Sequence, residues 1–389
     1  MLPHVRTRAV LVLTVASTSL IAGCSAPHSA SEAPATSSVT VAAGDTTCVV
    51  GSGQLRSGQH TFDVVNTSAQ VTEVYVYAAG ERIMGEVENV GPSTHRSLIV
   101  NLPAGDYQVA CKPGMVGLGI RTPLTVTGPA AAPEATDQQL KAAVDSYRTY
   151  VESEAQALLE TTGSLATTIK TGDLAKSKLA YAPARLHYER IEPIAESFGD
   201  LDPLIDMRAD DVTPTTPFVG FHALEQRMFQ KETLEGAPAL VDALVANTRK
   251  LADLVRTVEI TPLTMGNGAK SLLDEVAKSK VTGEEERYSG IDLLDLAGNV
   301  EGAKYVYTAL RPTLQSRDQQ LVATLDQRFP ALEGLLETHR TKAGDPGEIP
   351  GSPFQSYASL TPDQVKALAV EVDTISEPLG HLSSVVAGG

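Results

Sequence analysis

Apolar and polar residues alternate along several short runs between about residues 39 and 126, as they do in half-buried β-strands. HTFDVVN, TEVYVY and HRSLIVNL are examples of such runs, and Gly, Pro or Asn residues separate them. Strands of this length with turns between them predict a small β-sandwich over residues 39–128.

The period changes to three and four residues from about residue 137 onward, which is typical of amphipathic helices. Asp173 and Thr361 are predicted to cap helices, and Thr216 with Pro217 to start the helix that contains His222. Long helices joined by loops predict an all-α, up-and-down bundle over residues 137–389. The predicted fold class is therefore α+β in two domains, with a Pro- and Ala-rich linker at 129–136.

The first residues have the features of a lipoprotein signal peptide. Basic residues are followed by an apolar stretch over 9–21 that is too short to span a bilayer as a helix. The sequence Ile-Ala-Gly-Cys then predicts cleavage after residue 23 and lipidation of Cys24; an ordinary secretory signal is the alternative. Residues 24–38 are rich in Ser, Ala and Pro and are predicted to form a disordered tether. We therefore expect an exported protein, held by lipid on the outer, extracytoplasmic face of the cell membrane.

The overall composition narrows the classes of function. The formal net charge is −16, which argues against nucleic acid as a partner. The chain has no Trp, and aromatic residues make up 5% of it, which favours a helical interior built from Ala and Leu.

Five side chains in one helical stretch are candidate metal ligands. They are Glu189, Glu192, Asp206, His222 and Glu225. Glu189 with Glu192 and His222 with Glu225 are spaced i, i+3, so each pair would share one helix face. Buried charges of this density need a neutralising cation, and a metal ion is the simplest one. The alternative is that these are solvated helix faces and that His222 is an ordinary core histidine.

The types of ligand favour certain metals. Carboxylate oxygens prefer hard cations such as iron, manganese or calcium, and the single imidazole favours a transition metal. A structural zinc site would contain more sulfur or nitrogen than this set offers.

Three segments resemble the helical domain of imelysin-like proteins, and in particular the EfeO-type components of iron-uptake systems. They are YAPARLHYERIEPIAESFGDLDPLIDMRADD, FVGFHALEQRMF and GEEERYSGIDLLDLAGNVEGAKYVYTALRP. The resemblance implies that Glu189, Glu192, Asp206 and His222 bind iron, as Fe²⁺ or Fe³⁺, with Glu225 as a further ligand or a supporting residue. It also implies a lipid-anchored protein that captures iron and delivers it to a membrane iron permease, together with a haem-dependent peroxidase of the same system.

Two other functions are considered beside iron delivery. The family has also been described as a metallopeptidase, and Glu225 would be the general base of such a zinc enzyme. The chain has no His-Glu-x-x-His motif in this region, and four carboxylates would neutralise the charge that makes a metal a good Lewis acid. The third function is a surface-binding module in which the metal is structural.

A second acidic segment contains Glu284, Glu285, Glu286 and Asp292. Acids in the first turn of a helix are explained by the helix dipole alone. A second, weaker iron site is the alternative.

The β-domain resembles a cupredoxin, which implies copper or iron as a ligand. A blue-copper site needs two His, a Cys and a weak Met, and no histidine lies between Cys111 and Met115. Cys48 and Cys111 would form a disulfide in an exported protein. The resemblance instead makes them metal ligands with Glu73, and with Glu86 or Glu88, although Tyr75 stands where relatives have a second acid. Both interpretations remain open at this point.

Overall fold

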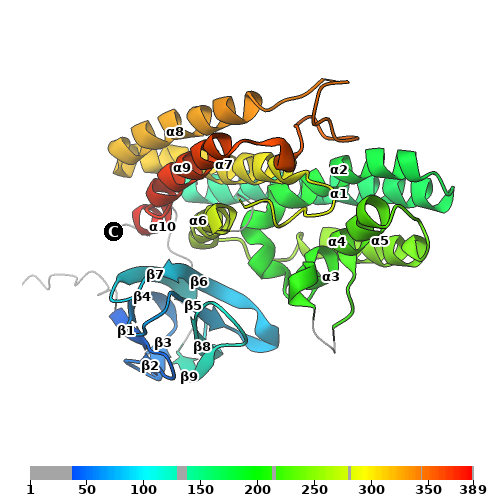
Figure 1. Cartoon of the computed structure of the whole chain (residues 1–389). Helices are drawn as coiled ribbons and strands as arrows, with labels where there is room; N and C mark the ends of the chain where they lie inside the picture. Colours follow the sequence, from blue (N-terminus) through cyan, green and yellow to red (C-terminus); the bar gives the residue numbers. More distant parts are fainter. Residues whose placement is uncertain (1–36, 129–137, 213–215, 279–281, 343, 388–389) are drawn as a thin grey trace, which may run out of the picture. The chain divides into compact units, whose positions relative to one another are not determined.

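The computed structural model describes residues 37–128, 138–212, 216–278, 282–342 and 344–387. The predicted signal peptide 1–23, the lipidation site Cys24, most of the predicted tether and the predicted linker 129–136 lie outside these residues. Figure 1 shows the strands in the N-terminal part of the described chain and the helices in the rest. The α+β fold class predicted from the sequence is confirmed.

The N-terminal part is a β-sandwich of two sheets. The first sheet has the strand order β2-β1-β4-β7 and the second has the order β3-β9-β8-β5-β6. The strands are β1 (Ser37–Ala43), β2 (Cys48–Val50), β3 (Gln54–Arg56), β4 (Gly58–Asn66), β5 (Thr72–Tyr77), β6 (Ile83–Val90), β7 (His95–Leu102), β8 (Gly105–Pro113) and β9 (Ile120–Thr127). Alternate residues such as Phe62, Val74, Val109 and Leu124 form one buried apolar core, as the period of two predicts.

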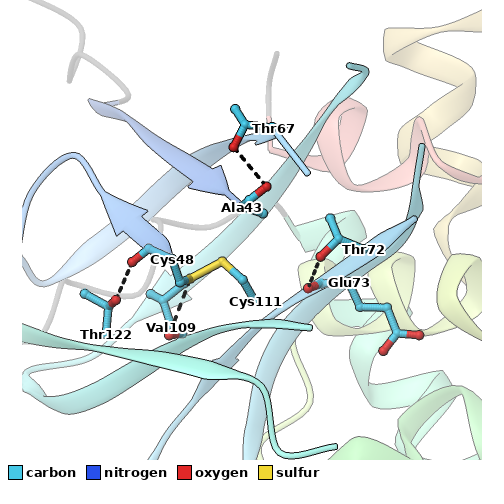
Figure 2. The surroundings of a disulfide bond; sticks show 8 residues. All are labelled: Ala43, Cys48, Thr67, Thr72, Glu73, Val109, Cys111 and Thr122. Atoms are coloured by element: carbon cyan, nitrogen blue, oxygen red, sulfur yellow. Dashed lines mark hydrogen bonds between the residues drawn. A yellow bond between two sulfur atoms is a disulfide. The ribbon is translucent and has the colours of Figure 1, made fainter. Parts of the chain in front are cut away.

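A disulfide joins Cys48 to Cys111 inside this core (Figure 2). Cys48 begins β2 in the first sheet and Cys111 lies on β8 in the second, so the bond links the two sheets; the two Cα atoms are 5.5 Å apart. A bond that closes a loop of this size contributes about 2–5 kcal/mol to the stability of a small exported domain. In the disulfide the sulfurs are not thiolates, so they are not the metal ligands that the cupredoxin resemblance implies.

The acids implied as ligands with these cysteines lie on the other face of the second sheet. Val74 pairs with Cys111 and faces the core, whereas the neighbouring Glu73 pairs with Lys112 on the opposite face. There the Tyr75 hydroxyl lies 3.2 Å from Glu73 Oε2 and 3.0 Å from Glu88 Oε1. The second sheet therefore lies between Glu73 and the two cysteines, Cys48 and Cys111, that the resemblance makes its fellow ligands.

Tyr75 is the centre of a group of acids on that outer face. Glu86 lies directly opposite Tyr75 in the pairing of β5 with β6. Burial raises the pKa of the Tyr75 hydroxyl, and Glu86, Glu88 and Glu73 raise it further. The phenol therefore keeps its proton and can donate a hydrogen bond to Glu73 or Glu88.

The rest of the described chain is helical. The main helices are α1 (Gln138–Lys170), α2 (Leu174–Ile191), α5 (Ala237–Leu254), α6 (Pro262–Lys278), α7 (Asp292–Arg317), α8 (Gln319–Glu337) and α9 (Pro362–Leu379). Shorter helices are α3 (Leu201–Asp206), α4 (Gly220–Glu225) and α10 (Leu382–Val386), and a 3₁₀ helix, η2, covers Glu192–Phe198. Among the described residues, each helix is too short or too polar to cross a membrane.

Two predicted helix starts are confirmed and one is wrong. The Asp173 side chain accepts a hydrogen bond from the Lys176 N–H at the start of α2, and Thr361 forms a capping box with Gln364 at the start of α9. Thr216 and Pro217 do not start the next helix, because α4 begins at Gly220.

Helix α2 packs against α1 on one side and α7 on another (Figure 1). Gly298 makes the second contact close: a Cβ atom at this position would lie 2.6 Å from Cβ of Glu189. The absence of a side chain at Gly298 therefore lets α7 bring its polar residues next to those of α2.

Candidate metal centre

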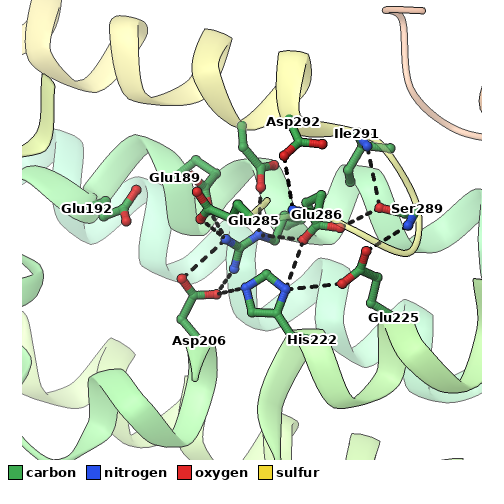
Figure 3. Close-up of polar contacts among 12 residues, drawn as sticks. Glu189, Glu192, Asp206, His222, Glu225, Glu285, Glu286, Ser289, Ile291 and Asp292 are labelled. Atoms are coloured by element: carbon green, nitrogen blue, oxygen red, sulfur yellow. Dashed lines mark hydrogen bonds and ion pairs between the residues drawn. The ribbon is translucent and has the colours of Figure 1, made fainter. Parts of the chain in front are cut away.

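Six carboxylates and one imidazole gather where α2, α3, α4, α7 and the turn before α7 meet (Figure 3). We call this set the acidic cluster: Glu189, Asp206, His222, Glu225, Glu285, Glu286 and Asp295. All are buried except Asp206, whose side chain is 9% exposed. Sulfur is absent from the set, so its donor atoms are hard oxygens and one imidazole nitrogen.

A glycine brings two members of the cluster together. Gly220 begins α4 with φ of 78°, in the left-handed region that favours glycine. A Cβ atom at this position would clash with the carbonyl oxygen of Ile205, near the end of α3. The start of α4 can therefore touch the end of α3, which puts His222 beside Asp206.

His222 has one ring nitrogen held by a carboxylate and the other facing acids. Nδ1 lies 3.2 Å from Oε2 of Glu225, and Nε2 lies 3.4 Å from Oδ1 of Asp206. Nε2 is buried and has no hydrogen-bond partner among the described residues. Burial lowers the pKa of His222, although the hydrogen bond to Glu225 opposes this effect. A neutral imidazole that donates from Nδ1 to Glu225 has its lone pair on Nε2, which is the form that binds a metal.

Both carboxylate oxygens of Glu225 have partners, and one of these partners is the imidazole. Its Oε1 accepts hydrogen bonds from the backbone N–H groups of Tyr288, at 2.8 Å, and Ser289, at 2.7 Å, while its Oε2 faces Nδ1 of His222. Of the two roles expected for Glu225, ligand or supporting residue, these contacts favour the supporting one.

Arg185 lies inside the acidic cluster, and the sequence reasoning did not identify it. Its side chain is 0% exposed. The guanidinium forms ion pairs with five carboxylates, those of Glu189, Asp206, Glu285, Glu286 and Asp295. Burial disfavours its charged form, but the surrounding carboxylates, with Glu189 and Asp295 foremost, raise the pKa of Arg185 well above its usual value. Arg185 therefore remains a cation.

Glu192 is connected to the cluster but lies at its edge. Helix α2 ends at Ile191, and Glu192 begins η2, whose next residue is Pro193. Glu189 and Glu192 therefore do not share one continuous α-helical face. The Asn299 side-chain amide joins them, since it lies 3.0 Å from Oε2 of Glu189 and 2.6 Å from Oε2 of Glu192.

Two residues of the second acidic segment, Glu285 and Glu286, belong to the same site. Helix α7 begins at Asp292, so Glu284, Glu285 and Glu286 precede it and are not in its first turn. Glu285 and Glu286 are buried in the cluster, whereas Glu284 is exposed. Burial and the charge of Glu225 raise the pKa of Glu286, whose Oε1 accepts a hydrogen bond from Tyr181. Glu285 and Glu286 therefore extend the site around His222.

Asp206, His222 and Glu285 form the most suitable place for a metal ion. Their ligand atoms lie within 4.8 Å of one another. The unpartnered Nε2 of His222 faces this place, whereas Nδ1, on the other side of the ring, is held by Glu225. Two carboxylates and an imidazole suit iron or a similar transition metal. Arg208, which lies 3.4 Å from Oε2 of Glu285, borders the site.

Comparison with known proteins identifies the family. The sequence model of a family described as Imelysin matches residues 143–382, which is most of the helical part. The chain belongs to the imelysin family and is an EfeO-type protein. "Iron uptake system component EfeO" of Yersinia pseudotuberculosis is 35% identical over 334 residues, covering 85% of this chain and 86% of that protein. The protein of the same name from Escherichia coli O157:H7 is 35% identical over 338 residues, covering 85% of this chain and 87% of its own length.

The structure brings together four of the five side chains that the sequence predicted in this EfeO-type chain. Glu189, Asp206, His222 and Glu225 lie in the cluster, and Glu192 lies beside it. Asp295 and Arg185 were not predicted. One signal was available, because Arg185 is spaced i, i+4 from Glu189 and so lies on the same face of α2.

Proposed function

We propose that this protein binds iron at the acidic cluster, outside the cytoplasm, and delivers it to a membrane iron permease. The observation that carries the proposal is the buried Nε2 of His222, which faces Asp206 and has no hydrogen-bond partner among the described residues. We choose iron as the metal because the relatives are named as components of iron-uptake systems. Asp206, Glu285 and Nε2 of His222 would be the ligands, with Glu189 and Glu192 nearby and Glu225 as the residue that orients His222.

The chemistry of the donors supports binding without hydrolysis. The carboxylates around the metal neutralise its charge and weaken it as a Lewis acid. Glu225, the candidate general base of a peptidase, already accepts two backbone N–H groups and contacts Nδ1 of His222. The site therefore suits an ion that is carried and released.

Metal competition on the full mature chain tests the proposal. Fe(III), Fe(II), Zn(II), Cu(II) and Ca(II) would compete for the wild type and for a His222→Ala/Asp206→Asn variant. We expect iron to bind tightly and the variant to lose about 100-fold or more in affinity. The matched control is Glu154→Gln/His187→Ala, which removes another carboxylate–histidine pair, 2.7 Å apart and outside the cluster. The control should bind iron as the wild type does.

Other outcomes would contradict the proposal. A preference for zinc would favour the peptidase, and equal iron binding in both variants would mean that the cluster is structural. Metal binding that supports the fold without any effect on iron-limited growth would favour the surface-binding module.

Delivery and anchoring are tested in cells. Deletion of the protein should slow growth on limiting iron, and the wild type should restore it while the His222→Ala/Asp206→Asn variant should not. Cys24→Ser should move the protein from the membrane fraction to the soluble exported fraction, if Cys24 carries the lipid. Cross-linking in the same cells should recover the permease and the haem-dependent peroxidase as partners.

A further inference from the structure

The guanidinium of Arg185 contacts both carboxylates that we assign to iron, those of Asp206 and Glu285, and also the neighbouring Glu189. Nη2 lies 2.6 Å from Oε1 of Glu189 and 2.9 Å from Oε1 of Glu285. Nη1 forms an ion pair with Oδ1 of Asp206, the atom that also faces Nε2 of His222. A metal ion and this edge of the guanidinium therefore compete for the same two carboxylates, and at Asp206 for the same oxygen.

The other edge of Arg185 is held by carboxylates outside the proposed ligand set. Nε lies 3.1 Å from Oδ2 of Asp295 and 3.3 Å from Oε1 of Glu286. These two contacts do not involve Asp206 or Glu285. They would keep the guanidinium in place while its Nη edge lost Asp206 and Glu285.

The positive charge of Arg185 has opposite effects on the cluster without iron and with iron. Without a cation, buried carboxylates at these distances would repel one another and their burial would be unfavourable. With a di- or trivalent metal ion on Asp206 and Glu285, the fixed positive charge of Arg185 repels the metal. Arg185 thus stabilises the cluster when iron is absent and opposes the metal when it is present.

We infer that Arg185 is a built-in countercation that iron replaces at Asp206 and Glu285, and that regains these carboxylates when iron leaves. This inference rests on the proposed function. The exchange needs no other reactant, because the carboxylates pass from one cation to another. Competition from Arg185 limits the affinity for iron and favours its release, which suits a protein that gives up the iron it carries.

The test is to remove the charge of Arg185 in the full chain. Arg185→Met keeps a long side chain without the cation. We expect the variant to bind iron about ten-fold more tightly or better, and to be less stable than the wild type when iron is absent. Iron should therefore raise its Tm by more than it raises that of the wild type. An affinity that is unchanged or weaker in the folded variant would overturn the inference.

A matched control and a second variant keep the test decisive. Arg208→Met removes a cation that borders the cluster and contacts Glu275 and Glu285 but not Asp206; it should increase the affinity less than Arg185→Met. If Arg185→Met does not fold, Arg185→Met/Asp295→Asn removes the cation together with one of its carboxylates. That variant should bind iron at least as tightly as the wild type, although it has lost an acid, and weaker binding would overturn the inference.

The results also separate the two proposals. If the wild type binds no iron, or if His222→Ala/Asp206→Asn binds it normally, the proposed function fails. If that variant loses its affinity for iron but Arg185→Met binds iron no more tightly than the wild type, only the proposed role of Arg185 fails.

Discussion

Nε2 of His222 lies 3.4 Å from Oδ1 of Asp206, although the two residues belong to different helices. The contact exists because Gly220 lets the start of α4 touch the end of α3. The candidate metal centre therefore depends on a residue that has no side chain.

Gly220→Ala should damage both the fold and the site. The new Cβ would clash with the carbonyl oxygen of Ile205, and alanine disfavours the φ of 78°. We expect the free energy of unfolding to fall by about 1–3 kcal/mol and the iron affinity to fall by about ten-fold or more, since ligand positions this precise tolerate little movement. Urea unfolding and metal competition measure the two effects.

Gly163→Ala is the matched control for that substitution. Gly163 lies within α1, and nothing lies within 4 Å of a Cβ placed there. This variant should gain roughly 0.5–1 kcal/mol in stability and bind iron normally. If Gly220→Ala behaved in the same way, the close approach of α3 and α4 would not matter to the site.

Glu225→Gln should weaken iron binding by changing the tautomer of His222. The amide oxygen of glutamine would accept the two backbone N–H groups, which leaves its NH₂ group facing Nδ1. Nδ1 would then be an acceptor, and the proton would move to Nε2, which could no longer bind the metal. We expect the affinity for iron to fall about 10–100-fold.

Isothermal titration with iron would measure this change. Glu232→Gln is the control, because Glu232 is nearby in sequence but exposed, and pairs with Lys178. Equal affinities in Glu225→Gln and the wild type would show that the orientation of His222 does not depend on this carboxylate.

Cys48→Ser/Cys111→Ser should destabilise the β-sandwich without affecting the acidic cluster. Loss of the bond between the two sheets should cost about 2–5 kcal/mol, measured by chemical unfolding of the full chain. Iron affinity at the helical site should stay as in the wild type, and a reductant should reproduce the effect on stability. A loss of iron binding in this variant would mean that the cysteines take part in binding after all.

Asp292 should make the metal-free protein less stable as pH rises. Burial raises the pKa of Asp292 to about 7, despite the hydrogen bond from the Glu286 N–H, which opposes the shift. An unfolded Asp has a pKa of about 3.9. Between these values the folded protein binds more protons than the unfolded one, so the free energy of unfolding falls as pH rises from about 4 to about 7.

Asp292→Asn should reduce this slope, since asparagine cannot ionise but can still accept the Glu286 N–H. Urea unfolding at several pH values, with iron chelated, compares the two proteins. The same slope in both would assign the pH dependence to acids of the cluster, such as Glu286, whose pKa is also raised.

The sequence alone predicted the two classes of structure and the residues with local signals. Strand alternation in the N-terminal part, the caps at Asp173 and Thr361, and the His222–Glu225 pair depend on neighbours within a few residues along the chain. Such signals are readable because a helix or a strand repeats at a constant period.

Tertiary structure decided which charges meet. Arg185 pairs with Glu285 and Asp295, which lie about a hundred residues further along the chain. Strand alternation separated Glu73 from Cys111, and this depended on the register of β5 against β8, which the sequence did not specify. Packing also decides whether a metal ion or a buried arginine neutralises the carboxylates. Only the folded chain shows which cation a buried carboxylate can reach.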